Sequence, residues 1–183
     1  MLYPDELWRG LESYLALTTR PIIAIDGPAG SGKTTLSLAV ENSLTSQNRS
    51  STTVHMDDLY DGWESALASG LTDRLKRLIA SHHQGLALEI PQFNWSENRF
   101  DEPLLREPSD CLILEGVGSG QRAVRDHKPF LIWIESESIT GLSRVLEREP
   151  YLSEDVMRRW QIQEANHFSA DETKVAANIK HST

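Results

Sequence analysis

Apolar residues in this chain fall into two patterns, short continuous runs and longer stretches with helical spacing. Continuous runs bounded by polar or turn residues are typical of strands buried on both faces of a sheet. Four runs have this form: Ile22–Asp26, Thr52–Met56, Leu112–Leu114 and Phe130–Ile134. Helical spacing marks residues 3–17, 35–46, 63–80 and 139–168. Because strands and helices alternate, the pattern predicts an α/β fold, a mainly parallel sheet between two layers of helices.

The remaining segments carry weaker signals. Residues 86–90 fit a short strand and residues 174–179 a last one, whereas the polar and aromatic stretch 91–106 fits an irregular loop. Pro150 lies inside the long helical region 139–168. Since proline lacks the backbone N–H that a helix interior needs, we expect two helices there.

The first predicted strand leads directly into Gly27-x-x-x-x-Gly32-Lys33-Thr34, the pattern of a phosphate-binding P-loop. Glycines allow the tight turn that brings successive backbone N–H groups around a polyphosphate. Lys33 can reach the β- and γ-phosphates, and the Thr34 hydroxyl can ligate Mg²⁺. The motif predicts binding of a nucleoside triphosphate, with ATP as the expected ligand and GTP still open. The expected binding residues are Gly27, Pro28, Ala29, Gly30, Ser31, Gly32, Lys33, Thr34 and Thr35.

Carboxylates follow other predicted strands. Asp57 and Asp58 come after the second strand, and Glu115 closes the run that ends at Leu114. Ligands of open parallel sheets bind beyond the carboxyl ends of the strands, so these side chains should meet near the P-loop. A carboxylate opposite the γ-phosphate can accept the proton of an attacking hydroxyl, which makes Asp57 a candidate catalytic base. A helix N-cap is the simpler alternative for Asp57 and Asp58.

Three segments together resemble the uridine kinase group of P-loop nucleoside kinases: Gly-Pro-Ala-Gly-Ser-Gly-Lys-Thr-Thr, Met-Asp-Asp-Leu-Tyr and Leu-Ile-Leu-Glu-Gly. The resemblance implies a three-layer P-loop NTPase fold. It also implies that Asp57 is the base and that Tyr60 contacts the substrate. By the same resemblance Glu115 is an acid linked to Mg²⁺, which Asp58 could assist through water.

The resemblance further implies a lid around residues 140–160. Arg144 and Arg148 share one helix face there and could neutralise the transferring phosphoryl group, Lys33 acting with them from below. A solvated charged helix is the alternative. For the acceptor, Phe93 and Trp95 could stack on a base and Arg99 could hydrogen-bond it, in the place where uridine kinases have a Tyr-Asp-Phe segment. Core packing explains the two aromatic residues equally well.

Composition and charge limit the classes of partner that the chain is expected to bind. A chain of 183 residues fits one domain, and its net charge of −9 argues against coating nucleic acid. The apolar runs are too short to span a membrane, and Cys111 is the only cysteine, so we expect a cytoplasmic protein without an intrachain disulfide. Formation of a homodimer is left open.

These features predict an ATP-dependent kinase that phosphorylates a hydroxyl of a small molecule, with a nucleoside as the leading acceptor. A cytidylate-type nucleotide kinase is one alternative, and a kinase for a sugar, shikimate or a pantothenate-like acceptor is another. A regulatory protein that binds ATP without catalysis is the alternative from a different class.

Overall fold

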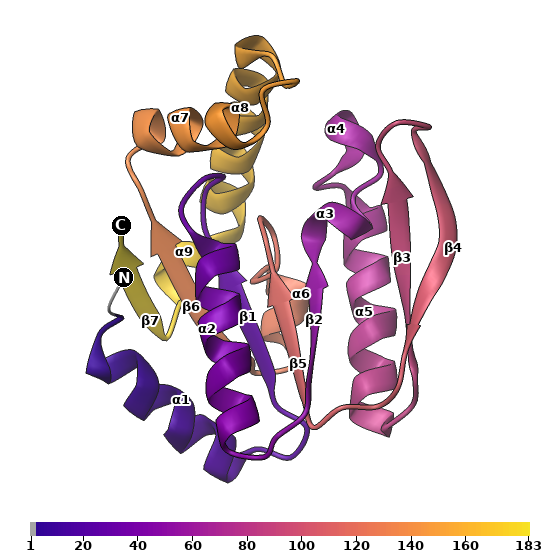
Figure 1. Ribbon diagram of the computed structural model, residues 1–183, viewed down its shortest axis with the longest axis vertical. Helices are drawn as coiled ribbons and strands as arrows, with labels where there is room; N and C mark the ends of the chain where they lie inside the picture. The colour runs from indigo at the N-terminus through magenta and orange to yellow at the C-terminus, as the bar shows by residue number, and fades with distance from the viewer. Residues whose placement is uncertain (1–2) are drawn as a thin grey trace.

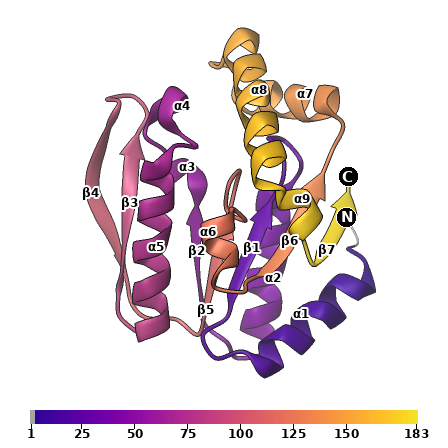
Figure 2. The ribbon, with the colours of Figure 1, turned by 180° about the vertical axis from the view of Figure 1, so that it is seen from behind.

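Five parallel strands form the central sheet of the computed structural model, which describes residues 3–183. The strand order is β2-β5-β1-β6-β7, and every neighbouring pair is parallel. The strands are β1 (Ile22–Asp26), β2 (Ser51–His55), β5 (Cys111–Glu115), β6 (Phe130–Glu135) and β7 (Ile179–Ser182). With helices on both sides of this sheet (Figures 1 and 2), the predicted three-layer α/β fold is confirmed.

Two apolar clusters join the helices to the sheet. On one face, α1 (Asp5–Leu17) and α2 (Lys33–Ser46) bury most of their leucines against Ile23 and Ile25 of β1. On the other face, α5 (Ser69–Gln84), α7 (Ser138–Arg148) and α8 (Glu154–Asp171) pack around Ile22, Leu112 and Leu114. Since successive side chains of a strand point to opposite faces, a strand covered on both sides must be apolar throughout, which explains the continuous runs. The short helices are α3 (Met56–Leu59), α4 (Gly62–Ser65), α6 (Arg122–Arg125) and α9 (Thr173–Ala176).

Residues 91–106 are not an irregular loop, as the sequence suggested. They belong to a two-stranded antiparallel hairpin of β3 (Leu88–Asn94) and β4 (Arg99–Arg106), outside the main sheet. Pro91 lies where the register shifts between Ile90 and Gln92, so the strand tolerates a residue that normally argues against one. Nearly every β4 side chain is exposed, so no alternation of buried and exposed residues marks the strand. The hairpin packs against α3 and α5 and lies beside β2, an edge strand of the main sheet (Figure 1).

Two other predicted elements differ from the structure. The stretch 63–80 contains two helices, α4 and α5, because Ala68 has an extended backbone between them. The segment predicted as a strand at 174–179 contains α9, and β7 begins only at Ile179. The division of 139–168 around Pro150 is confirmed, with α7 ending at Arg148 and α8 beginning at Glu154.

Candidate active site

The P-loop joins β1 to α2 through three glycines with positive φ angles, 145° at Gly27, 74° at Gly30 and 94° at Gly32. Two of these positions also need the absence of a side chain. A Cβ on Gly27 would lie 1.9 Å from the carbonyl oxygen of Ile134, and a Cβ on Gly30 would lie 2.2 Å from that of Gly141. The loop is therefore fixed between β6 and α7 by direct backbone contacts, and the N-terminus of α2 opens into the space above it.

Two buried carboxylates hold this loop. Asp26 accepts hydrogen bonds from the amides of Gly27, Gly118 and Gly120, at 2.8, 3.1 and 2.8 Å. Glu164 of α8 accepts one from the Ala29 amide at 3.0 Å. Burial raises the pKa of Asp26 to about 6 and that of Glu164 to about 7. The loop is thus attached to the strand below it, to the segment after β5 and to the helix above it.

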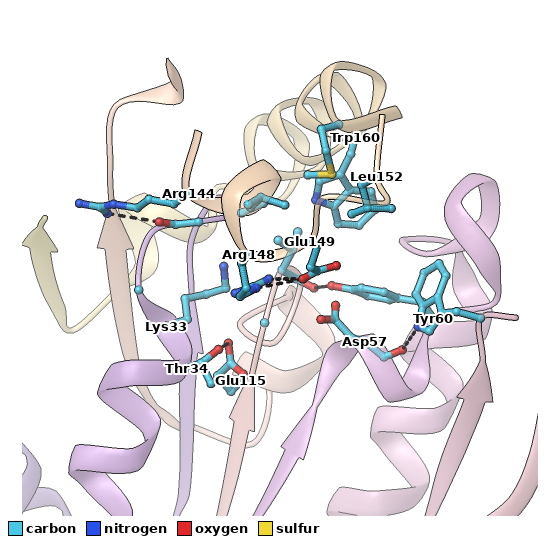
Figure 3. A pocket seen from close by; sticks show the side chains of 18 of the residues that line it. Lys33, Thr34, Asp57, Tyr60, Glu115, Arg144, Arg148, Glu149, Leu152 and Trp160 are labelled. Atoms are coloured by element: carbon cyan, nitrogen blue, oxygen red, sulfur yellow. Dashed lines mark hydrogen bonds and ion pairs between the residues drawn. The ribbon is translucent and has the colours of Figure 1, made fainter. Parts of the chain in front are cut away.

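A cavity of about 740 Å³ lies over the P-loop, at the carboxyl ends of the strands. It is walled by the P-loop and the start of α2 below, α3 on one side, and α7 and α8 above (Figure 3). Trp95 of the hairpin lines it as well. Six of the predicted nucleotide-binding residues line it: Ala29, Gly30, Gly32, Lys33, Thr34 and Thr35. Gly27, Pro28 and Ser31 complete the loop behind this wall.

Lys33, Thr34 and Glu115 meet at the base of the cavity. The Lys33 Nζ donates to the carbonyl of Pro28 at 2.8 Å, which folds the lysine over its own loop. The Thr34 hydroxyl donates to Glu115 Oε1 at 3.4 Å, and His55 Nδ1 lies 2.7 Å from Glu115 Oε2. The hydrogen bond to Glu115 raises the pKa of His55. The result is a hydroxyl and a carboxylate side by side, with the carboxylate oriented by a histidine.

Thr34 and Glu115 fit Mg²⁺ by their chemistry, because both offer the oxygen ligands that this ion prefers. Within residues 3–183 there is no group of three or more His, Cys, Asp or Glu side chains placed to hold a metal ion. This agrees with the usual binding of Mg²⁺ by one or two protein ligands together with phosphate oxygens and water. The P-loop, whose amides and lysine surround its centre, equally fits a polyphosphate.

Asp57 lies across the cavity from Lys33, at the start of α3 (Figure 3). Asp57 is exposed to solvent in the cavity, yet protein atoms crowd around its carboxylate. This enclosure, followed by the charge of Glu115, raises the pKa of Asp57 to about 6. Asp58 lines the same cavity, and burial raises its pKa as well. Both aspartates lie in the first turn of the four-residue helix α3, and neither is its N-cap, which is His55.

The predicted lid arginines come from α7, above the P-loop. Arg144 donates to the carbonyl of Gly30 at 3.3 Å and to the hydroxyl of Thr183 at 3.1 Å. Arg148 forms an ion pair with the neighbouring Glu149, through Nε at 3.0 Å and a terminal nitrogen at 2.6 Å. Both arginines line the cavity from above, so the structure brings them to the same space as Lys33 and Asp57.

The predicted acceptor residues divide into two groups. Tyr60 and Trp95 line the cavity, where the Tyr60 hydroxyl donates to the Val117 carbonyl at 2.8 Å and Trp95 Nε1 to the Asp57 carbonyl at 3.2 Å. Phe93 and Arg99 do not line it. Phe93 is buried between Trp95 and Phe100, and Arg99 pairs with Glu97 and Asp101 on the hairpin surface. The structure therefore corrects these two assignments: Phe93 is a packing residue, and Arg99 stabilises its own hairpin.

Cavity and loop residues that escaped prediction include Trp63, Glu149, Trp160 and Glu164. Trp160 is buried and also forms part of the cavity wall. Trp160 and Glu164 are four residues apart on α8 and so share one face. An apolar residue and an acid at that spacing were the available signal for a helix face directed at the P-loop. Glu149 gave no signal that separates it from a surface glutamate.

Several solved structures with the same fold are named as kinases. A possible uridine kinase from Bacillus stearothermophilus superposes with a TM-score of 0.68 and 21% identity, covering 97% of each chain. A proposed fructose transport system kinase from Silicibacter sp. TM1040 gives 0.77 and 19%, covering 98% of this chain and 99% of that one. D-glycerate 3-kinase from Cryptococcus neoformans gives 0.57 and 13%, over 92% and 88%. This chain has the P-loop kinase fold.

No protein-family model and no curated protein matches the sequence. Among the helices of residues 3–183, none combines the length and the apolar character needed to cross a membrane.

Proposed function

We propose that this chain is an ATP-dependent kinase that transfers the γ-phosphoryl group to a hydroxyl of a small molecule, with a nucleoside-like acceptor as the leading candidate. One observation carries the proposal. The P-loop lysine and Thr34 follow β1, Glu115 ends β5 and Asp57 follows β2, and all four line one cavity beneath two arginines. The kinases that share the fold support the same reaction class, although their low identity leaves the acceptor to be identified by experiment.

The proposed roles follow from position. Lys33 and the P-loop amides hold the phosphates, and Thr34 and Glu115 hold Mg²⁺. The ion would neutralise charge that develops on the phosphate oxygens. Asp57 accepts the proton of the acceptor hydroxyl as its oxygen bonds to the γ-phosphorus and the bond from that phosphorus to ADP breaks. A pKa of about 6 leaves Asp57 largely ionised at neutral pH, as a base must be.

We further propose that residues 140–160 act as a lid. Arg144 and Arg148 lie on one face of α7, and within residues 3–183 Arg148 is bound only to the adjacent Glu149, at a side-chain exposure of 61%. A side chain held so weakly can exchange its partner for a phosphate oxygen with little loss of stability. Arrival of the arginine would neutralise the transferring group and exclude water from it.

An assay of ADP release tests the proposal. ATP and Mg²⁺ are combined with a panel of nucleosides, nucleoside monophosphates, sugars and hydroxy acids, and Lys33→Ala serves as the inactive control. At least one acceptor should raise ADP release well above the rate with water alone, and its phosphorylated product should appear in mass spectra. If ATP binds but no acceptor raises the rate, the regulatory ATP-binding alternative is favoured instead.

A further inference from the structure

The wall of the cavity that faces the P-loop is aromatic and acidic. Its apolar residues include Tyr60, Trp63, Trp95 and Trp160, and its carboxylates are Asp57, Asp58 and Glu149. The three cations that line the cavity are Lys33, Arg144 and Arg148. An acceptor must lie between Asp57 and this wall if Asp57 is to take its proton. An acceptor in that position would therefore lie next to the negative charges of these carboxylates.

Each of the three cations already has a partner on the nucleotide side or within the lid. Lys33 and Arg144 bind the carbonyls of Pro28 and Gly30, both in the P-loop. Arg148 pairs with Glu149 and would leave this partner for a phosphate oxygen, so that Glu149 would keep its negative charge uncompensated. A triphosphate over the loop would recruit these same cations. No cation of the cavity lining is left to bind a carboxylate or phosphate on the acceptor.

Glu149 adds negative charge to the acceptor side. One of its oxygens accepts from Arg148 and the other from the hydroxyl of Tyr151 at 2.9 Å, so the carboxylate is held over the cavity rather than free in solvent. It lies between Arg148 and the Asp57–Tyr60 side of the cavity in Figure 3. Asp57 from below and Glu149 from above thus face the same space. An anionic acceptor would meet both at short range, in a cleft where water screens charge poorly.

The aromatic residues indicate the shape of the acceptor. The ring centroid of Trp63 lies 4.9 Å from that of Trp95 and 5.6 Å from that of Trp160. The ring centroid of Tyr60 lies 5.5 Å from that of Trp160. Such a group offers flat apolar surface, on which a base, the C–H face of a sugar or an organic cation can pack. Neither a carboxylate nor a phosphate gains from that contact.

We propose that the acceptor is a hydroxyl compound without negative charge, uncharged or cationic, that packs an apolar face on Trp63, Trp95 and Trp160, and that Glu149 is the residue that rejects anionic acceptors. This inference rests on the proposed kinase function and narrows it. The fold alone does not decide the matter, since one structure with this fold is named for glycerate, an anion. The acidic wall of this chain excludes acceptors of that class, and nucleoside monophosphates with them.

Pairs of compounds that differ chiefly in one anionic group test the inference. The pairs are pantothenol and pantothenate, methyl glycerate and glycerate, methyl shikimate and shikimate, and nucleosides with their 3′-monophosphates, which keep the 5′-hydroxyl. We expect the uncharged member to have the higher kcat/KM wherever a pair is turned over, by at least about 100-fold, because burying an unpaired charge beside two carboxylates is strongly unfavourable. Glu149→Gln should reduce that preference about tenfold, in line with the loss of one like charge in a partly screened site.

Glu154→Gln is the matched control. Glu154 also pairs with an arginine, Arg158, but both side chains are more than half exposed and neither lines the cavity. This variant should keep the wild-type preference, and both variants should keep the wild-type melting temperature. A wild-type preference for the anionic members, or an equal preference in the Glu149 variant and wild type, would overturn the inference while leaving a kinase in place.

A binding measurement separates this inference from the proposed function. Three tryptophans line the cavity, so tryptophan fluorescence in the presence of ADP and Mg²⁺ should report acceptor binding without turnover. If no compound raises ADP release, the kinase proposal fails, but tighter binding of uncharged members would still support the acceptor class. Tighter binding of anionic members, or no binding by any uncharged member, would contradict it.

Discussion

The two halves of the cavity are built by different means. The half that would hold the nucleotide is fixed by backbone: three glycines with positive φ, amides bound to Asp26 and Glu164, and side chains as buried as Lys33 at 8% and Glu115 at 6% exposure. The half that would hold the acceptor is made of side chains on separate elements. Trp95 is 39% exposed and comes from the hairpin, and Glu149 follows α7 with a side chain that is 27% exposed.

The difference shows how one fold can keep its phosphate donor and change its acceptor. A loop defined by backbone geometry tolerates few substitutions, because a Cβ at Gly27 or Gly30 would collide with another chain segment. Exposed side chains on a hairpin and a lid can be replaced at little cost in stability. Substitutions in the donor half should therefore impair all activity, and those in the acceptor half should change which compound reacts.

The largest effect is expected at Asp57, where the two halves meet. Asp57→Asn removes the proton acceptor without changing the shape of the side chain, so phosphoryl transfer should fall by about 10²- to 10⁴-fold. ATP affinity, measured by calorimetry, should change by less than a few-fold. Asp58→Asn is the control, since Asp58 lines the same cavity but is not proposed to take the proton, and its effect on kcat should be much smaller. Equal losses in the two variants would remove Asp57 as the base.

The pH dependence follows from the same residue. Asp57 must be ionised to accept a proton, and its pKa in the folded chain is about 6. The rate of transfer should therefore rise with pH through this region and level off above pH 7, when followed under saturating ATP. A rate that is constant from pH 5 to pH 8 would contradict the assignment.

Arg148 should be the next most sensitive position, because it is the lid residue proposed to neutralise the transferring phosphoryl group. Arg148→Ala should lower kcat by about 10²-fold, the usual order for losing one group that stabilises the developing charge. The free energy of unfolding of this variant should differ from that of wild type by less than about 1 kcal/mol, because the pair with Glu149 is largely solvent-exposed. Arg158→Ala removes a comparable exposed pair with Glu154 outside the cavity and should leave kcat unchanged. A similar loss of kcat in both variants would indicate a general effect of lid charge.

What the sequence predicted and what it missed follow the same division. Six of the nine predicted nucleotide-binding residues line one cavity with Asp57, Asp58 and Glu115, because a motif that works through backbone has a fixed spacing and parallel strands end at a common edge. The acceptor residues were placed less well. Phe93 and Arg99 are neighbours of Trp95 in sequence, but the pairing of β3 with β4 directs them into the hairpin itself.

Long-range contacts account for most of the rest. Glu164 is 135 residues away from Ala29, and nothing in the sequence near either one indicates their hydrogen bond. The hairpin was missed because β4 has no buried face and because Pro91 interrupts the pattern of β3. Each of these features arises from tertiary packing, which local periodicity does not record.

Gly141 tests whether the lid helix depends on close contact with the donor half. A Cβ there would lie 2.6 Å from the carbonyl oxygen of Ala29 in the P-loop. Gly141→Ala should therefore destabilise the protein by about 1–3 kcal/mol, measured by urea unfolding, as overpacking against backbone does. Gly70→Ala is the control in a helix, since its Cβ would meet only the flexible end of Arg74, and it should be neutral or slightly stabilising. Equal stability of the two variants would mean that α7 moves away from the loop freely.

The smallest expected effect concerns Glu164, which links α8 to the P-loop. Its folded pKa of about 7 lies above the ordinary value of 4.5, so the folded chain binds this proton more tightly than the unfolded chain does. The contribution of Glu164 to stability is then fully present below pH 4.5 and is lost as the pH rises through 7. Glu164→Gln keeps an acceptor for the Ala29 amide and removes the buried charge. The variant should match wild type near pH 4.5 and exceed its free energy of unfolding by about 1–3 kcal/mol at pH 8. Other titrating groups cancel in this difference, so a gap between the two proteins that is constant with pH would show that Glu164 holds the loop without titrating.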